Sequence, residues 1–178
     1  MTPLRQMAIS ELDRIAEIDR SEHISQQYKC RDSVLELIDV DIRAPRWGEL
    51  GEHTVQHYID SWSPLVEAGG VMLGAFDDGR LVGFAIFEPP GASLSQELAN
   101  FAVLHVTRTH RGRGIARALT NEVVRLARGL GAQRLYVSAT PTRTTVDFYL
   151  KQGFKPLMTP NERLFALEPD DIHMELRL

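Results

Sequence analysis

The chain is poor in cysteine, in long apolar runs and in excess positive charge. Its 178 residues include one cysteine, Cys30, which excludes an internal disulfide and leaves no Cys-x-x-Cys pair for a metal. The N-terminus lacks the apolar core of a signal peptide, and no stretch approaches a membrane span. A net charge of −4 argues against a broad nucleic-acid surface. We therefore expect a soluble, cytoplasmic protein with no metal, no nucleic acid and no membrane as partner.

What is present is an ordinary globular composition. The hydrophobic fraction of 43% and the charged fraction of 25% suit one domain that buries a proper core. We expect that domain to span residues 1–178. The mild acidic excess suits a cationic substrate, although it is equally common in proteins with no such substrate.

Apolar periodicity and turn residues predict the elements of the first half of the chain. They are a strand from Leu4 to Ile9, a helix capped by Ser10, a possible helix around Ser33 to Asp39, a helix from Gly51 to Val66, and a hairpin of strands Val71 to Phe76 and Leu81 to Phe87. The second half alternates strands with helices, which predicts an α/β fold containing a parallel pair with a right-handed crossover. Its expected elements are a buried strand from Phe101 to Val106, a helix with its apolar stripe from Ile115 to Leu130, a strand from Arg134 to Ser138, a helix opened by Thr140 and Pro141, and strands Phe154 to Met158 and Ile172 to Leu176.

A turn rich in arginine and glycine, from His110 to Ala116, joins the buried strand to the long helix. Glycine lets a backbone approach a ligand closely, and the free N–H groups of a helix start carry partial positive charge. With Arg111 and Arg113 they would form a cradle for a pyrophosphate. A plain glycine turn with solvated arginines explains the spacing equally well. The turn is not a P-loop, and Arg117 stands where a dinucleotide fingerprint needs glycine.

A second motif runs from Thr144 to Phe154. Aromatic side chains at such positions usually pack in a core, and Gly153 suits the end of a helix. Tyr149 differs because its hydroxyl is able to donate a proton. It is therefore a candidate acid as well as a candidate core residue.

Together the two motifs resemble those of the GNAT superfamily of acyl-CoA-dependent N-acetyltransferases. The family patterns Gln/Arg-x-x-Gly-x-Gly/Ala and Phe-Tyr-x-x-x-Gly-Phe are matched by Arg111, Gly114 and Ala116, and by Phe148, Tyr149, Gly153 and Phe154. The resemblance covers Asn100 to Phe154. It implies an α/β fold with a mixed, mostly antiparallel central sheet, flanking helices and a parallel pair at the cofactor site.

The resemblance also implies a reaction and its residues. Acetyl-CoA would be the co-substrate, and an amine bound beside it would attack the thioester directly. Tyr149 would protonate the departing thiolate, a role typically worth about 10²–10⁴ in rate. Cofactor contacts would come from the central strand, the turn with the helix start, and the residue that replaces a common family asparagine: Leu104, His105, Val106, Arg111, Gly112, Arg113, Gly114, Ile115, Ala116 and Thr142.

The general base is less defined. Some family members use a glutamate on the central strand, and the matching residue here, Asn100, takes no proton at neutral pH. Glu88 is our candidate catalytic base, with Glu97, His105 or a water chain as alternatives.

The acceptor pocket is expected in the first half of the chain, whose acids and aromatics suit a cationic amine. These residues are Asp39, Asp41, Glu49, Glu52, Asp60, Glu67, Trp47, Tyr58 and Trp62. A solvated surface over ordinary core aromatics explains them as well. The leading hypothesis is a small-molecule amine acetyltransferase; a peptide or lysine acetyltransferase and a non-catalytic acyl-CoA sensor are the alternatives. A homodimer formed through the final strand is a further expectation.

Overall fold

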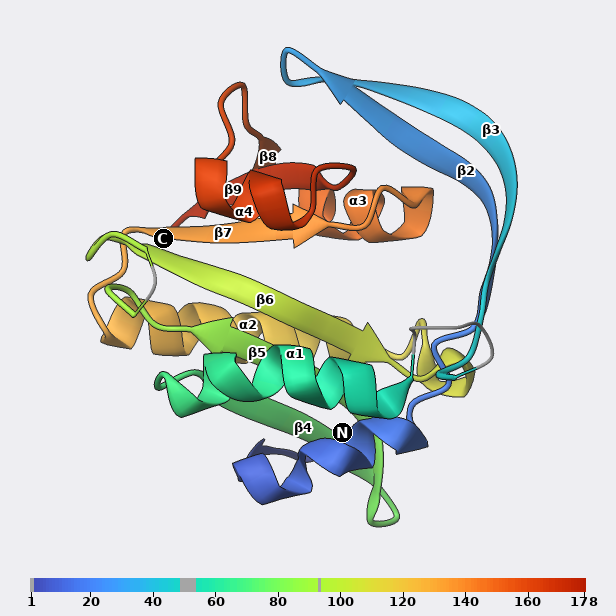
Figure 1. Cartoon of the computed structure of the whole chain (residues 1–178), viewed down its shortest axis with the longest axis vertical. Coiled ribbons are helices and arrows are strands. Elements are labelled where there is room, and N and C mark those ends of the chain that lie inside the picture. Colours follow the sequence, from blue (N-terminus) through green and yellow to red (C-terminus); the bar gives the residue numbers. More distant parts are fainter. Residues whose placement is uncertain (1, 49–53, 93) are drawn as a thin grey trace.

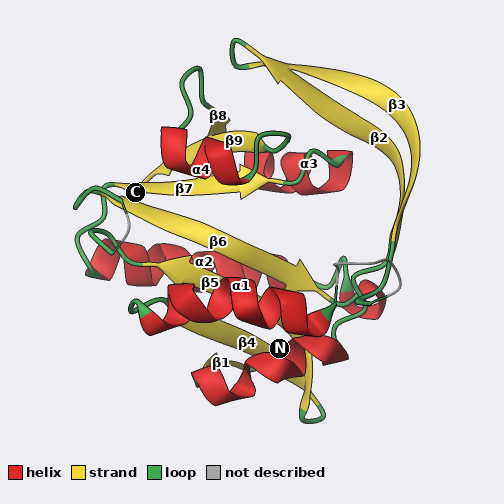
Figure 2. Ribbon diagram, viewed as in Figure 1, coloured by secondary structure: helices red, strands yellow, loops and turns green. Residues whose placement is uncertain are grey.

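The computed structural model describes residues 2–48, 54–92 and 94–178 of the chain. Within them, a seven-stranded sheet has the order β1-β4-β5-β6-β7-β9-β8, and β2 and β3 form a separate two-stranded sheet (Figure 1, Figure 2). The strands are β1 Leu4–Met7, β2 Glu22–Arg31, β3 Val34–Ala44, β4 Val71–Asp77, β5 Arg80–Glu88, β6 Leu98–Val106, β7 Arg134–Ala139, β8 Lys155–Pro156 and β9 Ile172–Arg177. β6 and β7 run parallel, and the other paired neighbours run antiparallel. The expected mixed sheet with a parallel pair is confirmed.

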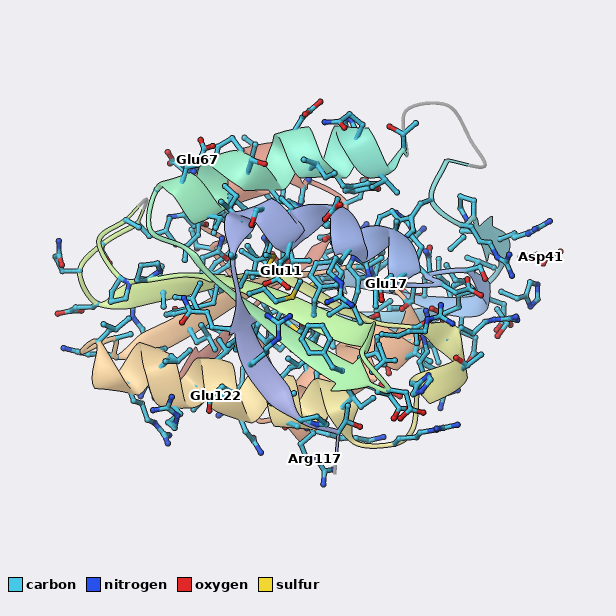
Figure 3. All side chains as sticks on the ribbon, turned by 90° about the horizontal axis from the view of Figure 1, so that it is seen from below. Glu11, Glu17, Asp41, Glu67, Arg117 and Glu122 are labelled. Carbon is cyan, nitrogen blue, oxygen red and sulfur yellow. The ribbon has the colours of Figure 1, made fainter. Side chains whose placement is uncertain are left out.

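Helices cover both faces of the larger sheet. They are the 3-10 helices η1 Ile9–Glu17 and η2 Arg108–His110, and the α-helices α1 Val55–Glu67, α2 Ile115–Gly129, α3 Arg143–Lys151 and α4 Glu162–Leu167. η1 and α1 pack around buried Ile15 on one face, and α2 and α3 pack around buried Leu119 on the other. Seen from below, Glu67 on α1 and Glu122 on α2 lie on opposite sides of the sheet (Figure 3). None of the helices formed by the described residues is both long and apolar enough to cross a membrane.

The expected helix around Ser33 to Asp39 is wrong, because these residues form the tip and second strand of the β2–β3 hairpin. Asp32 and Ser33 have φ angles of 50° and 61°, the combination of a two-residue type I′ turn that joins two strands tightly. From Ile38 to Arg43, β-branched apolar residues alternate with charged ones, which is the period of a strand. The hairpin arches past the end of the larger sheet (Figure 1).

Several expected boundaries also shift. The first helix begins after Ala8, so Ser10 lies inside it instead of capping it. Thr142 caps α3 by accepting a hydrogen bond from Thr145 N–H, so Pro141 precedes the cap and is not the first helical residue. The expected strand from Phe154 to Met158 is reduced to β8, and α4 had no counterpart among the expected elements.

The β4–β5 hairpin and α1 agree with the sequence pattern. Asp78 and Gly79 form the expected turn, with φ angles of 46° and 77°. The expected helix is observed from Val55 onward, and residues 51–53 lie outside the described residues. The stripe of α2 is confirmed as far as buried Val123, but Leu130 follows the helix and is 55% exposed, so its predicted place in the stripe is wrong.

The feature that positions the site is the divergence of the two parallel strands. β6 pairs with β7 only from Leu98 to Asn100. Beyond Asn100, β6 continues along β5 to Val106, while β7 continues along β9 to Ala139. The two strands therefore open like a V toward their carboxyl ends. The predicted burial of this strand is wrong for its last residues, since Leu104 to Val106 are only partly buried.

Candidate active site

A cavity of about 820 Å³ occupies the opening between β6 and β7. Its walls come from the diverging strands, the first turn of α2, one face of α3 and the base of the β2–β3 hairpin, which contributes Glu22, Ile24 and Ala44. Both sequence motifs reach this cavity, since Gly114 and Tyr149 line it. A volume of this size suits a ligand much larger than a single amino acid.

The turn before α2 presents a row of unpaired backbone donors. In the part of the chain that the structure describes, the N–H groups from Gly112 to Arg117 make no backbone or side-chain hydrogen bond. Gly112 and Gly114 have φ angles of 76° and 84°, and a Cβ built on either would meet no atom within 4 Å. Open space therefore lies over donors that also feel the positive end of the α2 dipole. This arrangement fits the pyrophosphate of an acyl-CoA.

The arginines at the start of α2 differ in whether their guanidinium groups have partners. The Arg111 guanidinium donates to Val106 O (3.3 Å) and to Glu22 Oε2 (3.1 Å), so it ties β6 to β2 and its charge is partly matched. The Arg113 and Arg117 side chains form no hydrogen bond or ion pair with any described residue. Arg117 lines the cavity mouth and projects outward from α2 (Figure 3). In the sequence, Arg117 was notable only because it stands where a dinucleotide fingerprint needs glycine. In the structure it lies beside the cradle and, like Arg113, is a cation without an ion-pair partner among the described residues.

The backbone of β6 offers further contacts. Thr107 N–H donates to Val82 O (2.9 Å), and hydrogen-bonded and open positions alternate along antiparallel strands. Leu104 and Val106 therefore turn their backbone N–H and C=O groups away from β5. Because β7 has already diverged there, these groups face the cavity, as a pantetheine arm would require.

Tyr149 lies deep in the cavity wall. Its ring packs against Phe101, Phe148 and Phe154 at centroid distances of 6.1, 5.2 and 5.2 Å, and its residue is 4% exposed. Burial, and secondarily the charge of Asp171, raises the pKa of the phenol above its ordinary value. A tyrosine with a raised pKa stays protonated at neutral pH and so keeps a proton to donate.

The Tyr149 hydroxyl has no hydrogen-bond partner among the described residues. Every buried polar side-chain atom in those residues does have one, so the hydroxyl must open onto the cavity. Thr142 also lines the cavity, but its hydroxyl is occupied in capping α3 through Thr145 N–H (3.3 Å). Its predicted cofactor contact remains a prediction.

Glu88 and Glu97 lie away from the cavity lining. Glu88 is 3% exposed, and its Oε2 accepts a hydrogen bond from Asn100 Nδ2 (2.6 Å) at the closed end of the V. Glu97 is exposed in the turn before β6, at the opposite end of that strand from Val106. Neither carboxylate is therefore placed for direct contact with a ligand at the open end.

His105 points to the α1 face of the sheet and stacks on Phe84 at 5.5 Å. Burial, with smaller contributions from Arg20 and Arg111, lowers its pKa to about 3. The imidazole is thus neutral at pH 7 and a weak base. It reaches the cavity wall as a packing group beside Trp62.

The expected acceptor residues divide in the structure. Trp47 and Tyr58 stack with the Arg20 guanidinium, which also donates to the Tyr58 hydroxyl (2.8 Å). Tyr58 and Trp62 line the cavity. Of the acids, Asp39 and Asp41 bond to side chains of β2, and Asp60 and Glu67 are exposed on α1; Glu49 and Glu52 lie outside the described residues. The described acids expected to recognise an amine are therefore not at the cavity.

Two carboxylates that the sequence analysis did not select do reach it. Glu168 and Asp171 lie in the segment between α4 and β9 and line the cavity together with Tyr149. No local sequence motif marks them, because they approach Tyr149 only through the pairing of β9 with β7. Among the described residues, no cluster of three or more metal-ligating side chains occurs.

Solved structures show the same fold. A nourseothricin acetyltransferase aligns with a TM-score of 0.71 at 19% identity, covering 98% of this chain and 97% of that one. A protein from Bacillus anthracis str. Ames proposed to be a streptothricin acetyltransferase, in complex with acetyl coenzyme A, aligns with a TM-score of 0.71 at 15% identity over 100% of both chains. The PaiA N-acetyltransferase of Thermoplasma acidophilum, in complex with coenzyme A, aligns with a TM-score of 0.62 at 19% identity over 100% of this chain and 99% of that one. No curated protein matches the sequence.

The sequence pattern of the acetyltransferase (GNAT) family matches residues 35–154. The match includes the α2 cradle, the diverging strands and Tyr149. The chain therefore belongs to the GNAT family of acetyltransferases.

Proposed function

We propose that this protein acetylates a primary amine of a small molecule by direct attack within a ternary complex. One observation carries the proposal: a single cavity joins an amide cradle at the start of α2 to the unpartnered hydroxyl of Tyr149. Direct transfer needs donor, acceptor and acid in one place, and this cavity is large enough for that. We also propose that residues 1–178 act as one domain.

The residues divide the work of the reaction. Acetyl-CoA supplies an activated acetyl group. Backbone N–H groups from Gly112 to Ala116 bind its pyrophosphate, and an N–H of Leu104 or Val106 donates to the thioester carbonyl as negative charge develops there. Tyr149 gives its proton to the sulfur that leaves. Loss of a single such acid typically lowers a rate about 10²–10⁴-fold.

The hairpin favours a small acceptor over a folded protein. β2 crosses the end of the cavity beside α3, where Tyr28 N–H donates to Pro141 O (2.8 Å) and the Tyr28 hydroxyl donates to Asp147 (2.9 Å). Glu22 and Ile24 of the same strand line the cavity. A strand fixed in this position leaves less room for a polypeptide than an open groove would. The streptothricin and nourseothricin names of two structural relatives also favour a small acceptor.

The test is release of free CoA thiol from acetyl-CoA. The acceptors are streptothricin, an aminoglycoside, spermidine and a peptide with a free N-terminus. We expect turnover with a small amine and a loss of about 10²-fold or more in kcat for Tyr149→Phe. Tyr136→Phe is the matched control, because Tyr136 is an equally buried tyrosine whose hydroxyl bonds to His173 (2.8 Å) outside the cavity.

The outcomes separate the alternatives. Turnover restricted to the peptide would replace the small-molecule proposal with a peptide acetyltransferase. Binding of acetyl-CoA without thiol release to any acceptor would favour the non-catalytic sensor. Equal turnover by Tyr149→Phe and Tyr136→Phe would remove Tyr149 as the acid.

A further inference from the structure

The cavity has a second, acidic wall. Ile172 of β9 pairs with Ala139 at the carboxyl end of β7, so the adjacent Asp171 stands across the V from the end of β6, where the α2 cradle lies. Glu168, at the end of α4, lines the cavity on the same side. In Figure 1 the α4–β9 segment and α3 lie beyond β7, and β6 borders the other side of the opening.

These two carboxylates are poorly compensated. Neither Glu168 nor Asp171 forms an ion pair with any cation in the described residues. Burial is the main cause that raises the pKa of Asp171 to about 7, with contributions from Glu168 and Asp170. Burial raises the pKa of Glu168 too, against a hydrogen bond from Ser138. Asp171 is half-buried and Glu168 is exposed. A half-buried carboxylate without a cation, such as that of Asp171, favours binding of one.

Tyr149 supplies an independent observation at the same place. Its residue is 4% exposed, its hydroxyl has no partner among the described residues, and it lines the cavity that Glu168 and Asp171 also line. Asp171 is close enough to raise the pKa of the phenol. A hydroxyl that faces the cavity without a partner, beside carboxylates that have no cation, indicates that a polar ligand completes the group.

The charged groups around Asp171 come from four elements. Glu168 and Asp170 belong to its own segment, and His173 belongs to β9. Tyr149 and Lys151 lie on α3, and Lys29, Cys30 and Asp32 lie at the tip of the β2–β3 hairpin. Burial lowers the pKa of His173, and burial raises that of the Cys30 thiol, so both are uncharged at neutral pH. The basic groups Arg111 and Arg117 line the opposite wall. The cavity is thus polarised from a cationic cradle to an acidic wall.

We propose that Glu168 and Asp171 form the acceptor subsite, which binds the ammonium group of the amine, and that Asp171 accepts its proton. This inference rests on the proposed acetyl transfer. One proton passes from the ammonium nitrogen to Asp171, and the freed electron pair forms the C–N bond as the C–S bond breaks. The sulfur takes the proton of Tyr149, and the remaining surplus N–H proton restores the phenol. Asp171 then releases its proton to water, so that the ammonium ion and the thioester yield amide, thiol and one proton.

The first test is equilibrium binding without acetyl-CoA. Calorimetry with spermidine and with streptothricin compares the parent chain with Glu168→Gln, Asp171→Asn and the control Asp170→Asn. Asp170 is an exposed neighbour that does not line this cavity. Loss of one charge-assisted hydrogen bond predicts binding about 10-fold weaker for each cavity variant and unchanged affinity for the control.

The second test is the pH profile of turnover. We expect kcat/KM of the parent to rise with pH through about 7, because Asp171 must be ionised to accept a proton. Asp171→Asn should lose this limb and most of kcat, whereas Glu168→Gln should mainly raise KM. Glu88→Gln tests the competing base and should keep the limb.

Binding of acetyl-CoA is measured on every variant, so the two proposals fail separately. If the parent binds no acetyl-CoA, the proposed function fails whatever the amines do. If thiol is released but all carboxylate variants bind and turn over like Asp170→Asn, only the subsite is overturned. The subsite is also overturned if the parent binds neither spermidine nor streptothricin. It is overturned as well if Glu88→Gln is the only variant that loses the pH limb.

Discussion

The two walls of the cavity are built from different parts of the polypeptide. The wall at α2 is made of backbone N–H groups held by Gly112 and Gly114 in left-handed conformations. The wall at β9 is made of the side chains of Glu168 and Asp171, brought to the cavity by strand pairing. A backbone cradle needs only small residues at fixed spacing, so many side chains are compatible with it. The acidic wall depends on the identity of its side chains, so it is the part of the cavity that is able to set which acceptor binds.

Replacing Gly114 should have the largest effect on the cradle. Gly114→Ala and Gly131→Ala form a matched pair, because both glycines have left-handed φ angles (84° and 82°) and open space at Cβ, at opposite ends of α2. Each change should cost about 1–2 kcal/mol of folding free energy from backbone strain. Gly114→Ala alone should also weaken acetyl-CoA binding, by about 10-fold, because its methyl group occupies the space above the donors.

Thermal unfolding and calorimetric titration of acetyl-CoA distinguish these effects. Similar losses of stability with unequal losses of affinity would support the backbone cradle. Equal affinities for both variants would show that the first turn of α2 does not bind the cofactor.

The same contrast explains how much the sequence revealed. The β6–α2–β7–α3 block was predicted closely, because glycine positions, helical periodicity and a buried strand are local signals. The hairpin was not predicted, because Asp32 and Ser33 form its turn in left-handed conformations without glycine, and a possible helix was expected around Ser33 to Asp39. Ser10 and Pro141 illustrate the same difficulty at boundaries, since neighbouring residues compete for the cap.

The candidate site was predicted unevenly for the same reason. Gly114 and Tyr149 lie in short motifs, so the spacing within each motif identifies the residue. Asp171 lies 22 residues after Tyr149 in the chain, and nothing in that interval encodes the β9–β7 register that brings the two together. Asp39 and Asp41, two of the acids expected in the first half, carry the same charge but lie on the hairpin. The sequence therefore predicted the charge and composition of the chain, but it did not predict which carboxylates share a cavity.

The acidic wall should reduce the stability of the free protein. The pKa of Asp171 is raised from 3.8 to about 7 in the folded chain, so the folded state holds a proton that the unfolded state releases. The contribution of protonated Asp171 to the free energy of unfolding is fully present below about pH 4 and is lost as pH rises through about 7. Asp171→Asn should therefore gain stability relative to the parent as pH rises, on the order of a few kcal/mol between pH 4 and pH 8.

Urea unfolding at both pH values measures this difference. Asp170→Asn, which removes an exposed neighbouring carboxylate, should show a much smaller change between pH 4 and pH 8. A pH-independent difference for Asp171→Asn would mean that Asp171 is well compensated in the folded chain, and the contrast between the two walls would weaken.

The smallest expected effect is that of the free arginines at the cradle. Arg113 and Arg128 are both exposed, and neither side chain forms a hydrogen bond or ion pair with the described residues, but Arg113 precedes α2 and Arg128 lies in its last turn. Arg113→Ala should weaken acetyl-CoA binding about 2–5-fold at low salt, since an exposed ion pair contributes about 0.5–1 kcal/mol. Arg128→Ala should leave affinity unchanged. Because exposed charges are screened, the difference should shrink toward 1 M salt; a difference that survives high salt would mean that Arg113 contacts the phosphates away from water, as part of the cradle itself.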